Sequence, residues 1–277
     1  MKKIVAIIIP LILGGCFSTE LEFEDQHLIV VEGYLYSGAN LAVINLTGMI
    51  SFGNDSTGGE GIENATVTLS KDQSQWVLQA NPDSAGNYLA VDKIPIQPGD
   101  TFHLLVETGE EILKSSTVIP DLPPAISLSA DSLFIPKIDD PREMGEIGFP
   151  EPIELTWENA EGNYYYFRIE NIESDPESII SDPPDDLPFR HGGFAFQMFT
   201  RPVNGAMYTI TARELTHFGT HRLIVYSVNQ EYVNLYETQE QDTRKLNEPF
   251  SNIDNGLGIF TSFSSDTMYF EVVPVYE

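Results

Sequence analysis

Cysteine is almost absent from this sequence of 277 residues, whose single cysteine is Cys16. Exported proteins that use cysteine to stabilise a small fold carry it in pairs, because each disulfide needs two thiols. A lone cysteine therefore excludes an intramolecular disulfide framework. Once Cys16 is accounted for, no free thiol remains for a cysteine nucleophile.

Positive charge is also scarce, since 14 Lys and Arg residues face 42 Asp and Glu residues and the formal net charge is −28. Such a charge repels phosphate backbones and excludes nucleic acid as a partner. It equally opposes binding flat on an anionic membrane surface. The acidic residues are spread along the whole chain, which is typical of a solvated surface; cation binding or a basic partner is the alternative.

Long apolar runs are missing as well. The run at residues 4–13 is too short to span a bilayer permanently, which takes about 20 apolar residues. Lys2 and Lys3 precede it, and residues 13–16 are Leu-Gly-Gly-Cys, a pattern typical of a secretory signal peptide. Small residues before Cys16 also resemble the lipobox of bacterial lipoproteins, in which that cysteine is acylated. The alternative is a plain cleaved signal with an incidental cysteine.

The remaining chain is long enough for one large or two ordinary domains, and its 42% hydrophobic residues suffice for a packed core. Short β-branched and aromatic segments recur at roughly ten-residue spacing between Gly, Pro and Asn turns, which favours antiparallel β-sandwiches. A proline-rich stretch interrupts them, and proline leaves a strand as a stiff linker. We predict five segments: a signal peptide (1–15), a lipidated tether (16–27), an N-terminal β-sandwich (28–119), a linker (120–125) and a C-terminal β-sandwich (126–277).

The predicted fold class is mainly β, with two antiparallel sandwiches of the immunoglobulin, fibronectin or transthyretin kind. Trp157 shortly before the aromatic residues 164–167 resembles a fibronectin-type sandwich, in which such a tryptophan fills the core. A strand there places two rings on each side. One side is core, and the other is either covered by a helix or open to a ligand; packing on both sides is favoured. The polar residues 170–193 are expected to form a surface loop.

One helix is predicted near residues 230–242. Asn229 can cap it, and Tyr232, Leu235 and Tyr236 recur at helical spacing. A final pair of strands is expected at residues 258–263 and 267–273.

Residues 251–260 lie between the helix and these strands. Gly256 and Gly258 indicate backbone angles that a Cβ would forbid, and Asn252 and Asn255 suit the same turns. We expect a buried turn that locks the helix against the second sandwich. A receptor-docking loop, which would leave Leu257 and Phe260 exposed, is the alternative.

Metal sites are not predicted. His217 and His221 are four residues apart, but Gly219 between them favours a plain turn over a shared metal. The acidic loops at residues 54–55 and 182–186 offer oxygen ligands without the residue order of a dedicated calcium loop.

No catalytic residue or cofactor is assigned either. No Gly-x-Ser-x-Gly motif occurs, and no helix is expected after the glycines at 58–61 or 256–258 to bind a phosphate. Carboxylate pairs carry no specificity among 42 acids. The chain is therefore expected to be no enzyme.

Several segments together resemble a family of Bacteroidetes lipoproteins, domain of unknown function 4249. They are the lipobox and residues 28–34, 98–104, 232–236, 247–253 and 256–260. Members of that family are often encoded near TonB-dependent receptors, which implies an accessory role in outer-membrane uptake. The resemblance implies no catalytic residues.

Our leading hypothesis is a lipid-anchored outer-membrane protein, on the periplasmic or cell-surface side, that assists a TonB-dependent transporter by binding the receptor or its substrate. A carbohydrate-binding surface lipoprotein of a glycan-utilisation system is the alternative, and a hydrolase comes third. An exposed aromatic platform would favour the carbohydrate hypothesis. Convergent polar groups with shifted pKa values would favour the hydrolase.

The anchor is testable. Cys16→Ser should release the protein from the membrane fraction, because the mature sequence contains no other apolar run of spanning length. The measurement is immunoblotting of membrane and soluble fractions after a high-salt wash. Retention of the variant in the washed membranes would contradict lipid attachment.

Overall fold

The computed structural model describes residues 28–48, 59–109, 111–138, 150–181, 197–240 and 250–275. The described chain is mainly β with one α-helix, so the predicted fold class is confirmed. The signal peptide, Cys16, the tether and the acidic loops at 54–55 and 182–186 lie outside the described residues. No helix within the described ranges combines the length and the apolar character needed to cross a bilayer.

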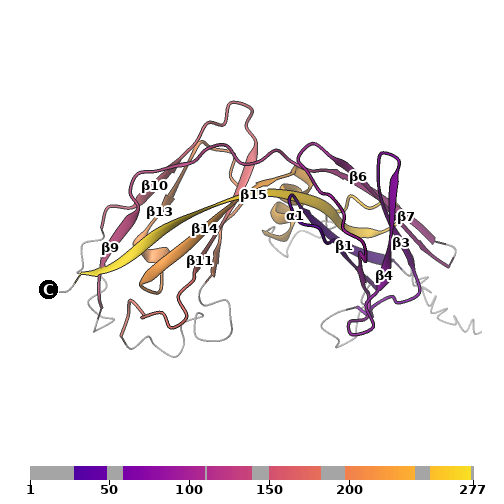
Figure 1. Ribbon diagram of the computed structural model, residues 1–277, viewed down its shortest axis with the longest axis horizontal. Helices are drawn as coiled ribbons and strands as arrows, with labels where there is room; N and C mark the ends of the chain where they lie inside the picture. The colour runs from indigo at the N-terminus through magenta and orange to yellow at the C-terminus, as the bar shows by residue number, and fades with distance from the viewer. Residues whose placement is uncertain are drawn as a thin grey trace, which may run out of the picture.

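Two lobes form an arch, and one long strand, β15 (Leu257–Val275), runs along it from one lobe to the other (Figure 1). Its first part pairs parallel to β1 (Ile29–Tyr36). Its later part pairs antiparallel to β14 (Gly219–Val228), and its end pairs parallel to β9 (Ser132–Pro136). The largest sheet of the described chain thus continues from one lobe into the other.

The expectation of two strands at 258–263 and 267–273 is wrong, because the polar residues between them stay extended. Ser264, Ser265 and Asp266 pair in register with β14. Ser264 also donates its hydroxyl to the carbonyl of Pro120, at 2.5 Å. These partners satisfy the polar groups without a turn.

The first lobe is a sheet that curls until its last strand returns to β15. From β15 the order is β1, β2 (Val43–Gly48), β5 (Asn87–Leu89), β4 (Ser74–Ala80), β3 (Thr66–Lys71), β6 (Thr101–Thr108) and β7 (Glu111–Val118). Ser262 on β15 donates its hydroxyl to the Val118 carbonyl at the end of β7, at 2.9 Å. Alternate residues such as Val31 and Leu35 fill the enclosed core.

The second lobe packs two sheets face to face. One contains β12 (Gln197–Phe199), β11 (Tyr164–Asn171), β14, β15 and β9; the other contains β13 (Met207–Ile210), β10 (Ile153–Thr156) and β8 (Ser127–Leu128). Trp157 lies in the core between them, with ring centroids 5.6 Å from Tyr165 and 5.5 Å from Phe167. The expected role of this tryptophan is therefore confirmed. A short 3₁₀ helix, Ala212–Glu214, precedes β14.

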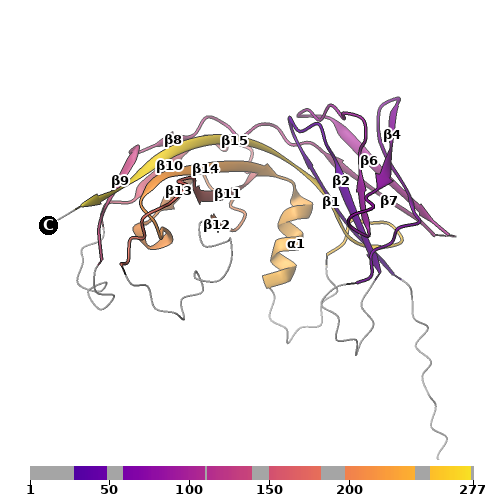
Figure 2. The ribbon, with the colours of Figure 1, turned by 60° about the horizontal axis from the view of Figure 1, so that its bottom comes forward.

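The α-helix, α1 (Gln230–Glu240), follows β14 directly and lies on the inner side of the arch between the lobes (Figure 2). Val233 is buried against β15, in a small cluster with Phe263. Asn229, expected as a cap, donates its side-chain amide to Thr117 Oγ1 (3.0 Å), the Val118 carbonyl (2.8 Å) and Ser262 Oγ (3.1 Å). The start of the helix is thus tied to the first lobe. Residues 241–249, into which the predicted helix extends, lie outside the described ranges.

Within residues 251–260, Ile253, Ile259 and Phe260 are buried, whereas Asp254 and Asn255 are exposed, and the segment packs against the first lobe instead of the expected second sandwich. Ile253 and Phe260 belong to the first lobe's core. Asn252 closes the turn, since its amide donates to the Phe260 carbonyl (2.8 Å) and its side-chain oxygen accepts from the Phe260 amide (2.9 Å). The reason is the parallel pairing of β15 with β1, which draws this segment away from the second sandwich. The predicted domain boundaries themselves stay a prediction.

The glycines of this turn differ in their constraint. Gly258 has φ +106° and Asn255 has φ 62°, whereas Gly256 is not in the left-handed region. A Cβ on Gly258 would lie 2.0 Å from the Val31 carbonyl oxygen of β1, which cannot move without breaking the strand pairing. A Cβ on Gly256 would meet the buried Leu113 side chain at 2.4 Å and the Ile29 carbonyl oxygen at 3.0 Å.

Gly258→Ala should therefore lower the free energy of unfolding by about 3 kcal/mol, through backbone strain and the clash with β1. Gly99→Ala is the matched control, because Gly99 has φ +83° with nothing within 4 Å of its Cβ position. It should cost only about 1 kcal/mol, the strain alone. Denaturant unfolding measures both, and equal losses would show that the β1–β15 contact does not constrain residue 258.

Candidate ligand-binding pocket

A cavity of about 230 Å³ lies at the junction of the lobes. It is lined by residues from β1, β11, β14, α1 and β15: Tyr34, Tyr36, Tyr166, Arg168, Tyr226, Tyr232 and Phe263. Five of these seven side chains are tyrosines. Both lobes contribute, so the cavity depends on how β15 joins them.

Strand alternation explains why aromatic rings meet here. On β1, Val31 and Leu35 enter the first core, so Tyr34 and Tyr36 point to the opposite face of the sheet. On β11, Tyr165 and Phe167 enter the second core, so Tyr166 points to the opposite face. The alternative left open by the sequence is thereby resolved. The second side of β11 is partly covered by α1 and partly lines a cavity.

The β15 register brings the two tyrosine faces together at Phe263. This residue pairs with Tyr36 of β1 on one edge and with Val228 of β14 on the other. Two residues further along the second edge, Tyr226 pairs with Ser265 on β15 and with Tyr166 on β11. The cavity is therefore set by backbone pairing across four strands, β1, β15, β14 and β11.

The rings hold one another in fixed orientations. Phe263 stacks on Tyr36 (5.2 Å between centroids, 22°) and makes an edge contact with Tyr232 (5.0 Å, 81°). Tyr166 contacts Tyr226 at 5.6 Å and Tyr232 at 5.9 Å. Stacked and edge-to-face pairs at these separations are favourable, so the lining is a preorganised aromatic wall.

The wall is open to solvent at Tyr36, whose exposed fraction is 44%. The other tyrosines that line the cavity are partly buried. A ligand in the cavity would therefore meet both the tyrosine ring faces and their hydroxyl groups. Such a mixture of ring faces and a few polar groups is typical of small-molecule sites.

The hydroxyl groups of Tyr34, Tyr36, Tyr166 and Tyr232 are protonated at neutral pH. Burial raises the pKa of Tyr34 to about 12, with a smaller contribution from Glu32. Burial also raises the pKa of Tyr36, Tyr166 and Tyr232. Neutral phenols donate and accept hydrogen bonds but do not act as general bases near pH 7.

The two histidines considered for a metal site lie in different surroundings. His221 is buried in β14, its ring stacked on Phe270 at 5.2 Å, and its Nδ1 lies 3.0 Å from the Gly219 carbonyl oxygen. His217 lies before the strand, with Nδ1 2.8 Å from Thr216 Oγ1. Burial lowers the pKa of both. Over the ranges that the structure describes, no three His, Cys, Asp or Glu residues group as metal ligands.

Sequence reasoning singled out Tyr166 and Tyr232 but not Tyr34, Tyr36 or Tyr226. The alternation of residues 29–36 was sufficient to place Tyr34 and Tyr36 on one face. The residues that Tyr34 and Tyr36 contact could not be predicted, because β1 and β15 pair although more than two hundred residues of sequence separate them. The signal that was missed is thus a long-range parallel pairing.

Comparisons with known proteins identify a family whose function is unknown. The sequence model described as "Domain of unknown function (DUF4249)" matches residues 16–268. No curated protein matches the sequence. Among solved structures, the chain is similar to a crystal structure of Salmonella alpha-2-macroglobulin reacted with methylamine, with 11% identity and a TM-score of 0.26. That match covers 90% of this chain and 15% of the other, and it carries no argument about fold or function.

Alkaline pH should destabilise the fold through the buried tyrosines. The pKa of Tyr34 is about 12 in the folded chain, against an ordinary value of 10.0. The contribution of the neutral Tyr34 to the free energy of unfolding is therefore complete below pH 10 and is lost as the pH rises towards 12. Tyrosinate absorbance and circular dichroism should show late-titrating tyrosines that ionise together with unfolding. Tyr34→Phe should shift that transition to higher pH. Ionisation of every tyrosine in one step near the ordinary pKa, without unfolding, would contradict the burial.

Proposed function

The chain belongs to the family described as domain of unknown function 4249, and we propose that it is a lipid-anchored binding protein that captures a small ring-bearing ligand for a TonB-dependent transporter. The chain acts without a cofactor and without catalysis. Of the two ways in which it was expected to assist a transporter, this proposal favours binding of the substrate over binding of the receptor.

The aromatic cavity is the observation that carries this proposal. Tyrosine and phenylalanine rings stack on the apolar faces of sugar rings, while phenol hydroxyls reach sugar hydroxyls. The volume of about 230 Å³ lies just below the roughly 300–1,000 Å³ typical of drug-sized ligand pockets. It therefore suits one ring, such as a monosaccharide or the end of a glycan. The cavity therefore favours the alternative hypothesis of a carbohydrate-binding lipoprotein as the specific version of this proposal.

The chemistry of the lining supports binding in preference to hydrolysis. Glycoside hydrolysis uses a carboxylic acid and a carboxylate on either side of the scissile bond. Among the described residues that line the cavity there is no carboxylate. Burial raises the pKa of Tyr34, Tyr36 and Tyr166, so these phenols stay protonated at neutral pH and are not available as general bases.

The proposed anchor fits the same role. Cys16 would carry the lipid, and residues 16–27 would form the tether at the outer membrane, on its periplasmic or cell-surface side. A segment of about 12 residues spans at most roughly 40 Å when extended. Tyr34 and Tyr36 follow within one strand, so the cavity would stay within reach of a transporter in the same membrane.

The test is binding of a panel of neutral monosaccharides and short glycans, measured by calorimetry and thermal shift. Tyr36→Ala should weaken the affinity of any ligand found by roughly tenfold, since one lost stacking contact is worth about 1 kcal/mol or more. Tyr269→Ala is the matched control, because Tyr269 is an exposed tyrosine on β15 outside the cavity.

Equal effects of the two substitutions would contradict a binding role for the cavity. In cells, deletion of the gene should slow uptake of the same ligand, and the Tyr36→Ala variant should not restore it. If the Tyr36→Ala variant restored uptake to the level of the unaltered protein, the cavity would not be needed for the proposed role in transport.

A further inference from the structure

Arg168 is the one charged side chain among the described residues that line the cavity. It lies on β11, two residues after Tyr166 and on the same face, opposite Ile224 of β14. Its charge reaches the rings, since it partly offsets the burial that raises the pKa of Tyr36 and Tyr166. In a chain of net charge −28, a cation at an aromatic cavity requires an explanation.

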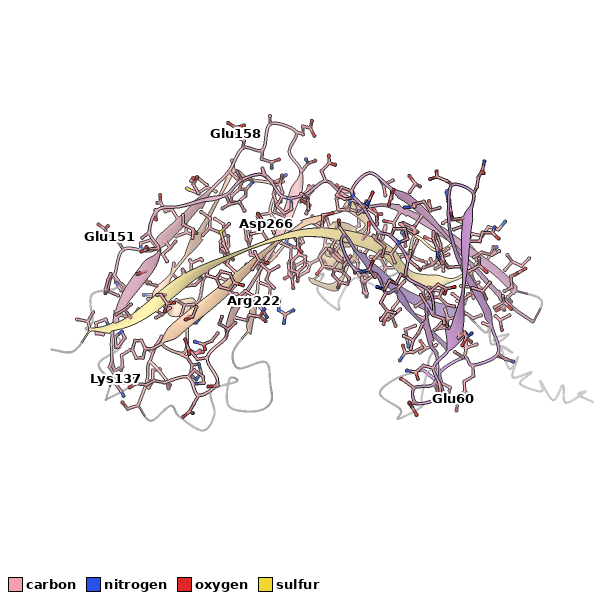
Figure 3. All side chains as sticks on the ribbon, viewed as in Figure 1. Glu60, Lys137, Glu151, Glu158, Arg222 and Asp266 are labelled. Atoms are coloured by element: carbon pink, nitrogen blue, oxygen red, sulfur yellow. The ribbon has the colours of Figure 1, made fainter. Side chains whose placement is uncertain are left out.

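Two arginines converge beside this cavity on one buried carboxylate. Arg168 Nη2 lies 2.7 Å from Glu170 Oε2, and Arg222 contacts Glu170 Oε1. Glu170 is 4% exposed, and a buried carboxylate requires such partners. Figure 3 shows Arg222 on β14, on the inner side of the arch.

Glu170 also fixes the direction of Arg168. The carboxylate lies one β11 repeat beyond Arg168 on the same face, so the ion pair holds the guanidinium along the strand. The Arg168 side chain keeps 30% of its surface exposed. A guanidinium can bind a carboxylate through two parallel N–H groups.

A negative charge acts from the side of the first lobe, on Glu32, which does not itself line the cavity. Glu32 lies two residues before Tyr34 on β1, and its charge acts on Tyr34, whereas Arg168 acts on Tyr36 and Tyr166. A ligand that bears one negative charge is therefore favoured in a single orientation, with the charge at the second lobe.

We propose that the cavity selects a ring-bearing ligand with a carboxylate, which Arg168 binds while the ring packs on Tyr36, Tyr166 and Phe263. Arg168 is the specificity-determining residue, and Glu170 is a positioning residue that acts through it. The inference rests on the proposed function and names the ligand class. A hexuronic acid and an aromatic carboxylic acid share this chemistry, and matched probes distinguish them.

The experiment is calorimetry on the purified protein with two acid and neutral pairs: D-glucuronate against D-glucose, and benzoate against benzyl alcohol. The acid of one pair should bind about tenfold to a hundredfold more tightly than its neutral partner, the range expected for charge-assisted hydrogen bonds. The pair that shows this preference identifies the ligand class, either a sugar acid or an aromatic carboxylic acid.

Arg168→Met should abolish the acid preference, so that the acid and its neutral partner bind the variant with equal affinity. Lys137→Met is the control, because Lys137 is also a cation in an ion pair, with Glu177, but lies at the far end of the second lobe (Figure 3). Arg168→Lys keeps the charge beside Glu170 and serves if the methionine variant does not fold. It should reduce the preference, because lysine cannot bind a carboxylate through two parallel N–H groups.

The outcomes separate this inference from the proposed function. Equal affinity for the acid and the neutral partner in both pairs overturns the inference that the ligand carries a carboxylate, but leaves the proposed binding role intact. An acid preference that survives Arg168→Met overturns the assignment of Arg168. Binding of neutral glycans in the earlier panel, with none of the four probes bound, overturns this inference alone. No binding in either experiment overturns both.

Discussion

The pairing of β15 with strands of both lobes is the constraint on which the rest of the structure depends. Its backbone forms a parallel ladder with β1 and an antiparallel ladder with β14, and both ladders meet at Phe263. A flexible linker would leave two β-rich lobes free to move apart. Here the hydrogen bonds of one sheet fix them, and the aromatic cavity inherits that geometry.

The polar contacts at the junction reinforce the same arrangement from the side of the helix. Asn229 joins the start of α1 to the end of β7 and to Ser262 of β15. Thr117 and Ser262 share a buried hydrogen bond of 3.0 Å. Since buried polar groups are costly when unpaired, this network opposes any shift of the helix relative to the strands. Tyr232 is thereby held against Phe263.

Local pattern was enough to predict most of the elements but not how they associate. Alternation in residues 164–167 placed Tyr165 and Phe167 in a core, and the spacing after Asn229 located the helix. The final strand was divided in error, because Ser264 and Asp266 resemble a turn until their partners on β14 are known. The cavity was not predictable, because its two halves lie on β1 and β11 and meet only through a pairing far apart in sequence.

The parallel ladder between β1 and β15 also determines when the chain can fold. β1, the first strand of the described chain, cannot pair with β15, the last one, until the end of the chain is available. The first lobe therefore cannot close while the polypeptide is still emerging from a ribosome or a translocation channel. Contacts of such long sequence separation slow folding. If the chain is exported as proposed, this delay is useful, because secretion machinery that threads extended polypeptide receives one that has not yet folded.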